Sequence, residues 1–75
     1  MKGVLTMSKL YLLDDCGNSP CLGLDETVEI ESDVDEQNAK INFADNLVQN
    51  EGFEYSYIPE YDVCKNEKHY KIVMQ

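Results

Sequence analysis

Three cysteines and a single histidine carry the spacing in this 75-residue sequence that most directly suggests chemistry. Four residues separate Cys16 from Cys21, four separate Cys64 from His69, and each pair straddles a segment of turn-forming residues. Three thiolates and one imidazole form a ligand set that tetrahedral zinc accepts, so this pattern predicts a candidate zinc site. The spacing is longer than in a CxxC motif, and two alternatives stay open: a Cys16 and Cys21 redox pair, and ordinary reduced thiols beside a surface histidine.

Other catalytic motifs are missing from the sequence. The segment CGNSPC differs from a CxxC motif that opens a helix and lowers a thiol pKa, which disfavours redox chemistry. His69 is the only imidazole, so a histidine-assisted nucleophile would have to be one of the three cysteines, and no serine lies in a recognisable elbow. The sequence contains no P-loop and no GxGxxG motif, and its acidic run lacks the central glycine of an EF-hand loop. We therefore expect a protein that is not an enzyme.

Acidic residues dominate the charge of the chain. Fifteen Asp and Glu stand against six Lys and no Arg, giving a formal net charge of -9, and residues 10–39 contain nine carboxylates without one cationic side chain. Phosphate contacts need Lys or Arg, so we expect no direct binding to nucleic acid and no attraction to anionic lipid. The charge fits a basic protein as partner, for example a nucleic-acid-handling enzyme. The residues expected to bind this partner are Asp25, Glu26, Glu29, Glu31, Asp33, Asp35, Glu36, Glu54 and Tyr61.

Glu29 and Glu31 alternate with Val28 and Ile30, as on a half-buried strand with one acidic face. Residues two apart lie about 6.6 Å from each other on such a face, on the order of two phosphate rises of about 3.4 Å along one DNA strand. If the strand continues to Asp33, the resulting ladder would mimic a nucleic acid. A simpler interpretation is a solvated edge strand that resists aggregation, followed by acids that stabilise a helix N-terminus.

These patterns lead to two functional predictions. The first is a non-enzymatic protein-interaction module, an inhibitor or regulator that occupies a basic surface of its partner. The second is a zinc-stabilised mini-domain that acts as an adaptor or regulatory subunit, in which the acidic charge is incidental. Tyr55, Tyr57 and Tyr61 interleave with acids and would suit a basic, partly apolar groove. Alternatively, the shared parity of Phe53, Tyr55 and Tyr57 places them on a sheet face beneath a helix.

Apolar periodicity and turn residues predict the elements that position these side chains. We expect strands at residues 9–15, 21–31 and 69–74, and another at 53–64 with an interruption at Pro59. We expect a helix from a cap at Ser32 or Asp33 to Glu51, before Gly52. This ββαββ order predicts a small α+β domain of two layers, with one helix packed across an antiparallel sheet of about four strands. The buried face of the helix would carry Val34, Ile41, Ala44 and Val48, flanked by Phe43 and Leu47.

Seventy-five residues allow one small domain, residues 1–75, in which burial only just offsets the loss of conformational entropy. A monomer and a homodimer both remain open. Residues 1–6 lack a structural pattern, so we expect them to be disordered, with Met7 as an alternative start. We find no signal peptide and no apolar run near the roughly 20 residues that cross a bilayer, and an odd number of cysteines is unusual in a secreted disulfide framework. We therefore expect a soluble cytoplasmic protein.

Overall fold

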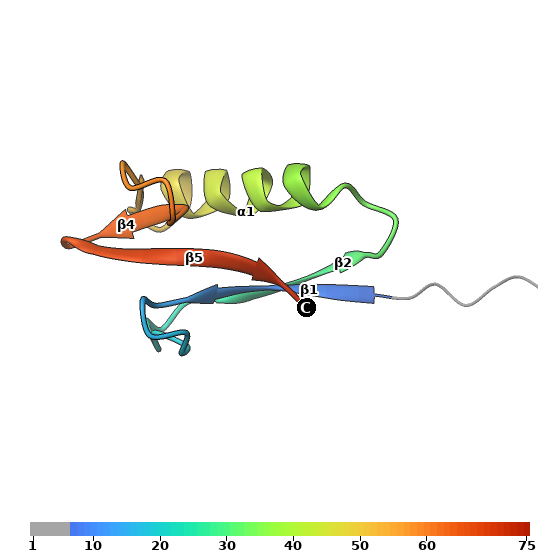
Figure 1. The fold of residues 1–75 in the computed structure, drawn as a ribbon, viewed down its shortest axis with the longest axis horizontal. Helices are drawn as coiled ribbons and strands as arrows, with labels where there is room; N and C mark the ends of the chain where they lie inside the picture. Colours follow the sequence, from blue (N-terminus) through green and yellow to red (C-terminus); the bar gives the residue numbers. More distant parts are fainter. Residues whose placement is uncertain (1–6) are drawn as a thin grey trace, which may run out of the picture.

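One helix lies across an antiparallel sheet of five strands in the computed structural model, which describes residues 7–75 (Figure 1). The elements in chain order are β1 (Met7–Leu13), β2 (Thr27–Glu31), α1 (Glu36–Asn50), β3 (Glu54–Tyr55), β4 (Val63–Lys65) and β5 (Lys68–Met74). The predicted α+β class and the single helix are confirmed. The predicted disorder of residues 1–6 lies outside the described residues. Within the described range, no helix is long and apolar enough to cross a membrane.

The strands lie in the order β2-β1-β5-β4-β3, and every neighbouring pair is antiparallel. Strand β5 joins the two halves of the sheet: residues 68–70 pair with β4, and residues 71–74 pair with β1. The helix covers one face, while the loop after β1 and the β4–β5 hairpin lie at the same end of the sheet (Figure 1). The connection from β2 to α1 lies at the opposite end. Residues of the two hairpin loops are therefore neighbours, and the β2–α1 turn is remote from them.

The sheet has one more strand than expected, because residues 53–64 form two strands and not one interrupted strand. Tyr55 pairs with Val63, so the chain reverses between them, and the Ser56 N–H donates to the Asp62 carbonyl at 3.2 Å. Pro59 lies in the loop between the two strands, where its missing N–H costs no ladder hydrogen bond. The observed order is therefore ββαβββ, and the loop of residues 56–62 becomes available to cover other side chains.

The core lies between α1 and the sheet. Alternate residues of β1 and β5 point toward the helix, and ten side chains form the buried cluster: Leu10, Leu12, Ala39, Phe43, Ala44, Leu47, Phe53, Val63, Tyr70 and Ile72. Val28 and Ile30 of β2 pack against the cluster but are only partly buried. The sheet face opposite the helix therefore presents Glu29 and Glu31, because neighbouring residues of a strand point to opposite faces.

The buried face of the helix differs from the predicted one. Ala39, Phe43, Ala44 and Leu47 are buried, whereas Ile41 is 48% exposed and Val34, before the helix, is 40% exposed. Since successive helical residues turn by about 100°, Ile41 points about 200° away from Ala39. The sequence contains apolar residues on more than one face of the helix, and packing against the sheet selects the face with Phe43 and Leu47.

The helix begins later than predicted and ends as predicted. Asp35, and not Ser32 or Asp33, is the N-cap: its carboxylate accepts the Asn38 N–H at 3.1 Å. The preceding residues form a turn in which the Val34 N–H donates to the Glu31 carbonyl at 3.0 Å. At the other end, Gly52 has a φ of 79°, a left-handed conformation that glycine adopts without steric cost.

The tyrosines after the helix do not pack beneath it. Phe53 is buried, but Tyr55 is 55% exposed and Tyr57 is 82% exposed. Tyr55 does face the helix, since its hydroxyl donates to the Asp45 carboxylate, but β3 is the edge strand and leaves the ring largely in solvent. Tyr57 lies beyond the end of β3, where strand parity no longer applies. The predicted packing beneath α1 is therefore wrong for Tyr57, whereas Tyr55 lies on the helix side as predicted but is largely exposed.

Candidate functional site

The four predicted zinc ligands do not converge. Cys64 and His69 are direct cross-strand neighbours on β4 and β5, while Cys16 and Cys21 lie in the exposed loop after β1. Among residues 7–75, the one group of three or more metal-type ligand atoms within 4.8 Å of one another is Asp14, Asp15 and Cys16. The geometry that tetrahedral zinc requires is therefore not assembled, even though both hairpin ends lie at the same end of the sheet.

The Cys64 thiol is packed against the neighbouring strand. It is buried, and its Sγ lies 3.9 Å from the Tyr55 carbonyl of the adjoining strand. All three thiols are free, so Cys16 and Cys21 do not form a disulfide. A thiol that packs inside a sheet is a small apolar side chain with a weak donor, which is the commonest role of a buried cysteine.

The charge around Cys16 opposes thiolate chemistry. The carboxylates of Asp15 and Asp14 raise the pKa of the Cys16 thiol above its ordinary value, because negative charge disfavours the thiolate. Only the thiolate acts as a metal ligand or a nucleophile. The surroundings of Cys16 therefore disfavour a redox pair, in which a free thiolate must attack.

Asp15→Asn should accelerate alkylation of Cys16 by iodoacetamide at pH 8, because removing the carboxylate with the larger effect lowers the pKa of the thiol toward its ordinary value. The rate is measured for each cysteine separately by peptide mass spectrometry. Asp25→Asn removes an exposed carboxylate without changing the immediate surroundings of Cys16 and is the matched control. Equal rates in the parent and Asp15→Asn would show that the local charge does not control this thiol.

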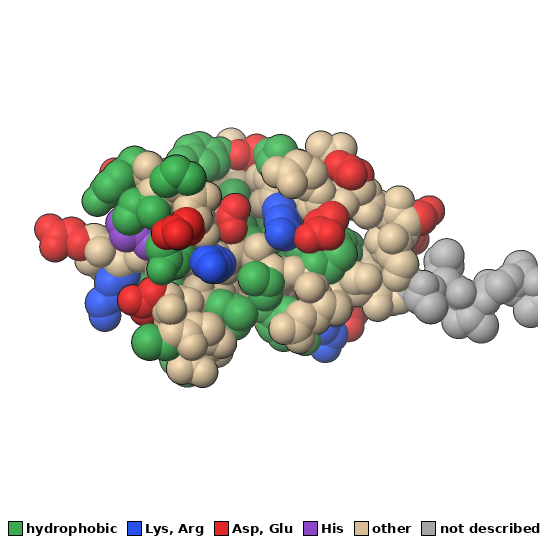
Figure 2. Space-filling model, viewed as in Figure 1, with side chains coloured by type: hydrophobic (Ala, Val, Ile, Leu, Met, Phe, Trp, Pro, Cys, Tyr) green, Lys and Arg blue, Asp and Glu red, His purple; other side chains and the backbone are tan. Residues whose placement is uncertain are grey.

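The loop between β3 and β4 folds over His69. The Tyr57 and His69 ring centroids lie 5.0 Å apart in an edge contact, and the Tyr61 ring centroid lies 5.7 Å from that of His69. The Lys71 ammonium lies 5.6 Å from the Tyr61 ring centroid, within the range of a cation-π contact. On the face shown in Figure 2, hydrophobic side chains gather around the histidine, and carboxylates and lysines are interspersed elsewhere.

Ser56 and His69 form a contact that the sequence did not indicate. Ser56 Oγ lies 2.9 Å from His69 Nδ1, a pairing that could in principle activate a serine. However, the same hydroxyl accepts the Ile58 N–H at 3.0 Å and lies 3.3 Å from the Ile58 carbonyl, so it closes its own turn. A triad also needs a group that orients the imidazole, and no carboxylate is hydrogen-bonded to His69 among the described residues. The contact holds the loop against β5.

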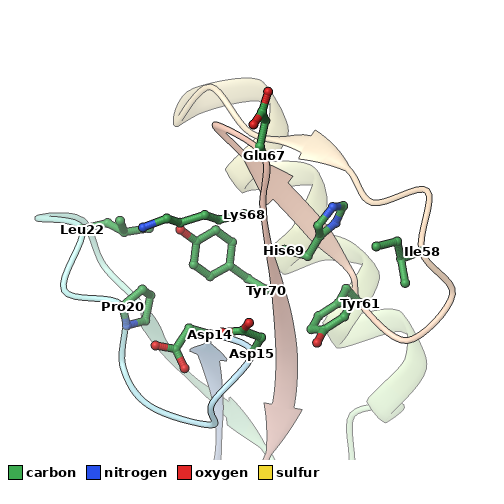
Figure 3. Close-up of a pocket in the computed structure, with 10 residues that line it drawn as sticks. All are labelled: Asp14, Asp15, Pro20, Leu22, Ile58, Tyr61, Glu67, Lys68, His69 and Tyr70. Atoms are coloured by element: carbon green, nitrogen blue, oxygen red, sulfur yellow. The ribbon is translucent and has the colours of Figure 1, made fainter.

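A cleft of about 460 Å³ lies beside this cluster (Figure 3). The β1–β2 loop forms one wall with Asp14, Pro20 and Leu22, and Tyr61 and His69 line the other side. Desolvation raises the pKa of Tyr70 in this cleft, and the charges of Asp14, Glu26 and Asp15 raise it further. Lys68 extends from the β4–β5 hairpin into the same space, so the walls already contain both signs of charge. Asp14, Asp15 and Glu67 outnumber this lysine, so the lining has a net negative charge and does not favour an anionic ligand.

Several predicted partner-binding acids instead have local structural roles. The Glu26 carboxylate accepts the Ser19 hydroxyl at 2.5 Å and the Leu22 N–H at 2.6 Å. Desolvation alone would raise the pKa of Glu26, but these hydrogen bonds outweigh it and lower the pKa. Asp35 caps the helix, and Glu36 pairs with Lys40 at 3.1 Å. The contacts of these three acids explain their presence without a partner.

Glu29 and Glu31 are exposed on the sheet face opposite the helix, and Asp33 is exposed in the turn that follows β2. We call these three residues the β2 acidic edge. Lys9 pairs with Glu29 at 3.9 Å, an exposed ion pair, and is the cation nearest to this surface in the register of the sheet. The strand ends at Glu31, so Asp33 lies in the turn and does not continue the predicted ladder. Asp25 is also exposed, just before β2.

The other two predicted contact residues lie elsewhere. Glu54 is on β3, the opposite edge of the sheet, and Tyr61 packs on His69. Four strand spacings of about 4.8 Å separate β2 from β3, so Glu54 cannot share a small interface with the β2 acidic edge. The nine predicted residues therefore do not form one continuous surface.

The comparisons of this chain with family models, curated proteins and solved structures gave no significant match.

Proposed function

We propose that this chain is a non-enzymatic protein-interaction module that binds a basic surface of a partner protein through the β2 acidic edge. The observation that supports this proposal is the exposure of Glu29, Glu31 and Asp33 on one edge of the sheet, with Lys9 as the paired cation. Ordinary protein surfaces intersperse the two signs of charge, whereas these three acids are all exposed on one strand and the turn that follows it. A basic patch is the complement of such a surface.

The nucleic-acid site of an enzyme is the specific kind of basic surface that this geometry favours. Glu29 and Glu31 lie two residues apart on one face, which is about 6.6 Å along a strand and on the order of two phosphate rises. Binding there would inhibit or regulate the enzyme by competing with its nucleic acid. Since the strand supplies two of the carboxylates and the turn supplies the third, the match to a duplex is local and short.

The experiment is capture of soluble proteins from a cell lysate on the immobilised protein, followed by elution in steps of salt. We expect basic proteins to be retained at about 0.05 M salt and released below about 0.3 M, because exposed charges are screened within about 10 Å or less above 0.1 M. The matched control is an immobilised Glu29→Lys/Glu31→Lys variant. Proteins retained equally by both columns, or retained at high salt, would contradict the proposal.

A further inference from the structure

The outer edge of β2 presents unpaired backbone groups. Lys9 and Gln75 exchange both backbone hydrogen bonds at 2.9 Å, so the polar groups of Lys9 point toward β5. Because the direction alternates along a strand, the polar groups of Leu10 and Leu12 point toward β2. The hydrogen bond of 2.8 Å from the Leu12 N–H to the Glu26 carbonyl confirms this direction. In β2, the polar groups of Val28 and Ile30 therefore face β1, and those of Thr27 and Glu29 face outward, where no strand of the described chain pairs with them.

The side chains along this edge alternate in chemistry as well as in direction. Glu29 and Glu31 are exposed on the face opposite the helix, while Val28 and Ile30 are only partly buried on the helix side. An extended segment placed along β2 would bring alternate residues beside the carboxylates and beside the two apolar side chains. Its complement is a segment in which basic and apolar residues alternate.

We propose that β2 receives an extended basic segment of the partner as a sixth, antiparallel strand of the sheet. This proposal rests on the proposed function and adds the conformation of the bound segment to it. Backbone hydrogen bonds to Thr27 and Glu29 would supply affinity, and the alternation of charge would fix which face the basic residues occupy. Antiparallel pairing is the arrangement of every other strand pair here and has the more stable ladder.

A second copy of this chain fits the same edge poorly. Two β2 strands pairing about a two-fold axis would place Glu29 and Glu31 of one copy beside the same acids of the other, and like charges directly opposite each other are destabilising. The acids therefore select against self-association and for a basic strand at the same edge.

The probe is the heptapeptide Lys-Val-Lys-Val-Lys-Val-Lys with blocked ends, titrated into the protein at low salt and followed by the chemical shifts of the protein amides. In the proposed antiparallel pairing, the lysine N–H groups point toward β2 and the valine N–H groups point away. Backbone N-methylation of the lysines should therefore abolish binding, whereas N-methylation of the valines should preserve it. Only three of the four lysines are methylated, so that these two peptides have the same charge, length and number of N-methyl groups.

Thr27→Pro is the matching change in the protein, because its N–H points outward and β1 loses no ladder hydrogen bond. We expect it to weaken binding of the unmodified peptide about three- to tenfold, as loss of one hydrogen bond implies, while Thr27→Val leaves binding unchanged. The amide spectra of both variants establish that they remain folded.

The outcomes separate this inference from the proposed function. If the two methylated peptides bind equally, or if the valine-methylated peptide does not bind, the segment does not add to β2 as a sixth strand. If Glu29→Gln/Glu31→Gln still weakens binding in that case, attraction of a basic partner stands without strand addition. If neutralising both acids has no effect on binding of the unmodified peptide, the proposed function itself fails, whatever the methylated peptides show.

Discussion

Leu47→Ala is expected to lower the free energy of unfolding by about 2–5 kcal/mol. Leu47 is 0% exposed and lies in the core cluster between α1 and the sheet, so truncation removes buried methyl groups and leaves a cavity. At roughly 0.05–0.15 kcal/mol per residue, a chain of 75 residues has about 4–11 kcal/mol of stability in total. The substitution therefore removes a large fraction of the stability, and urea unfolding followed by circular dichroism measures it.

Ile41→Ala is the matched control on the same helix. Ile41 is 48% exposed, so its truncation should change stability by no more than about 0.5 kcal/mol. Leu47→Met keeps the volume, is expected to cost less than about 1.5 kcal/mol, and provides a measurable variant if the alanine protein does not fold. If Ile41→Ala costs more than Leu47→Ala, the helix packs through the face that includes Ile41, and the orientation of α1 described here is wrong.

The sequence predicted the elements with strong local patterns. The alternation from Val28 to Glu31 marks β2, and the apolar run that includes Leu10 and Leu12 marks β1. Gly52 ends the helix one residue after Glu51, because it adopts a left-handed conformation at low cost. These features depend on neighbouring residues, so they are visible in the sequence without knowledge of the packing.

Features that depend on distant contacts were predicted less well. The helix contains apolar side chains on several faces, and only the sheet determines that Phe43 is buried and Ile41 exposed. Residues 53–64 alternate like one strand, but β3 contains only Glu54 and Tyr55 before the chain reverses. The reversal that separates β3 from β4 is defined by their antiparallel pairing, which the alternation of residues 53–64 does not reveal.

The candidate site shows the same division between local and distant information. Asp35 and Glu36 have the helix N-terminal roles that the simpler interpretation of the acidic run predicted. The sequence did not show that Glu26 holds the loop after β1, because its partners Ser19 and Leu22 are brought to it by loop geometry. Likewise, the spacing of Cys16 and Cys21 in the sequence equals that of Cys64 and His69, but this equality gave no information on the distance between the two pairs.

Reversing the charge of Glu29 and Glu31 is expected to have the largest effect on function. Electrostatic steering raises association rates by about 10- to 1000-fold at low salt, and the two carboxylates supply most of the charge on the exposed face of β2. Glu29→Lys/Glu31→Lys should therefore slow association with a basic partner by about 10- to 100-fold near 0.05 M salt. The difference should shrink as salt rises, because screening weakens the attraction and the repulsion alike.

Glu60→Lys/Glu67→Lys is the control for net charge. Both acids are exposed in loops at the end of the sheet remote from the β2–α1 turn, and the double change alters the net charge by the same amount. A general effect of net charge would slow association equally in both double variants. An effect of the β2 acidic edge would be much larger in the first variant. Thermal melting of both proteins establishes that the comparison is made between folded chains.

The association rate of these two variants with a basic partner recovered on the wild-type column tests the central claim most directly. Stopped-flow measurement at about 0.05 M and 0.5 M salt gives the rates over the range in which screening acts. We predict that the Glu29→Lys/Glu31→Lys rate falls at least tenfold below the Glu60→Lys/Glu67→Lys rate at low salt and approaches it at high salt. Equal rates for the two variants at low salt would contradict the assignment of partner binding to the β2 acidic edge.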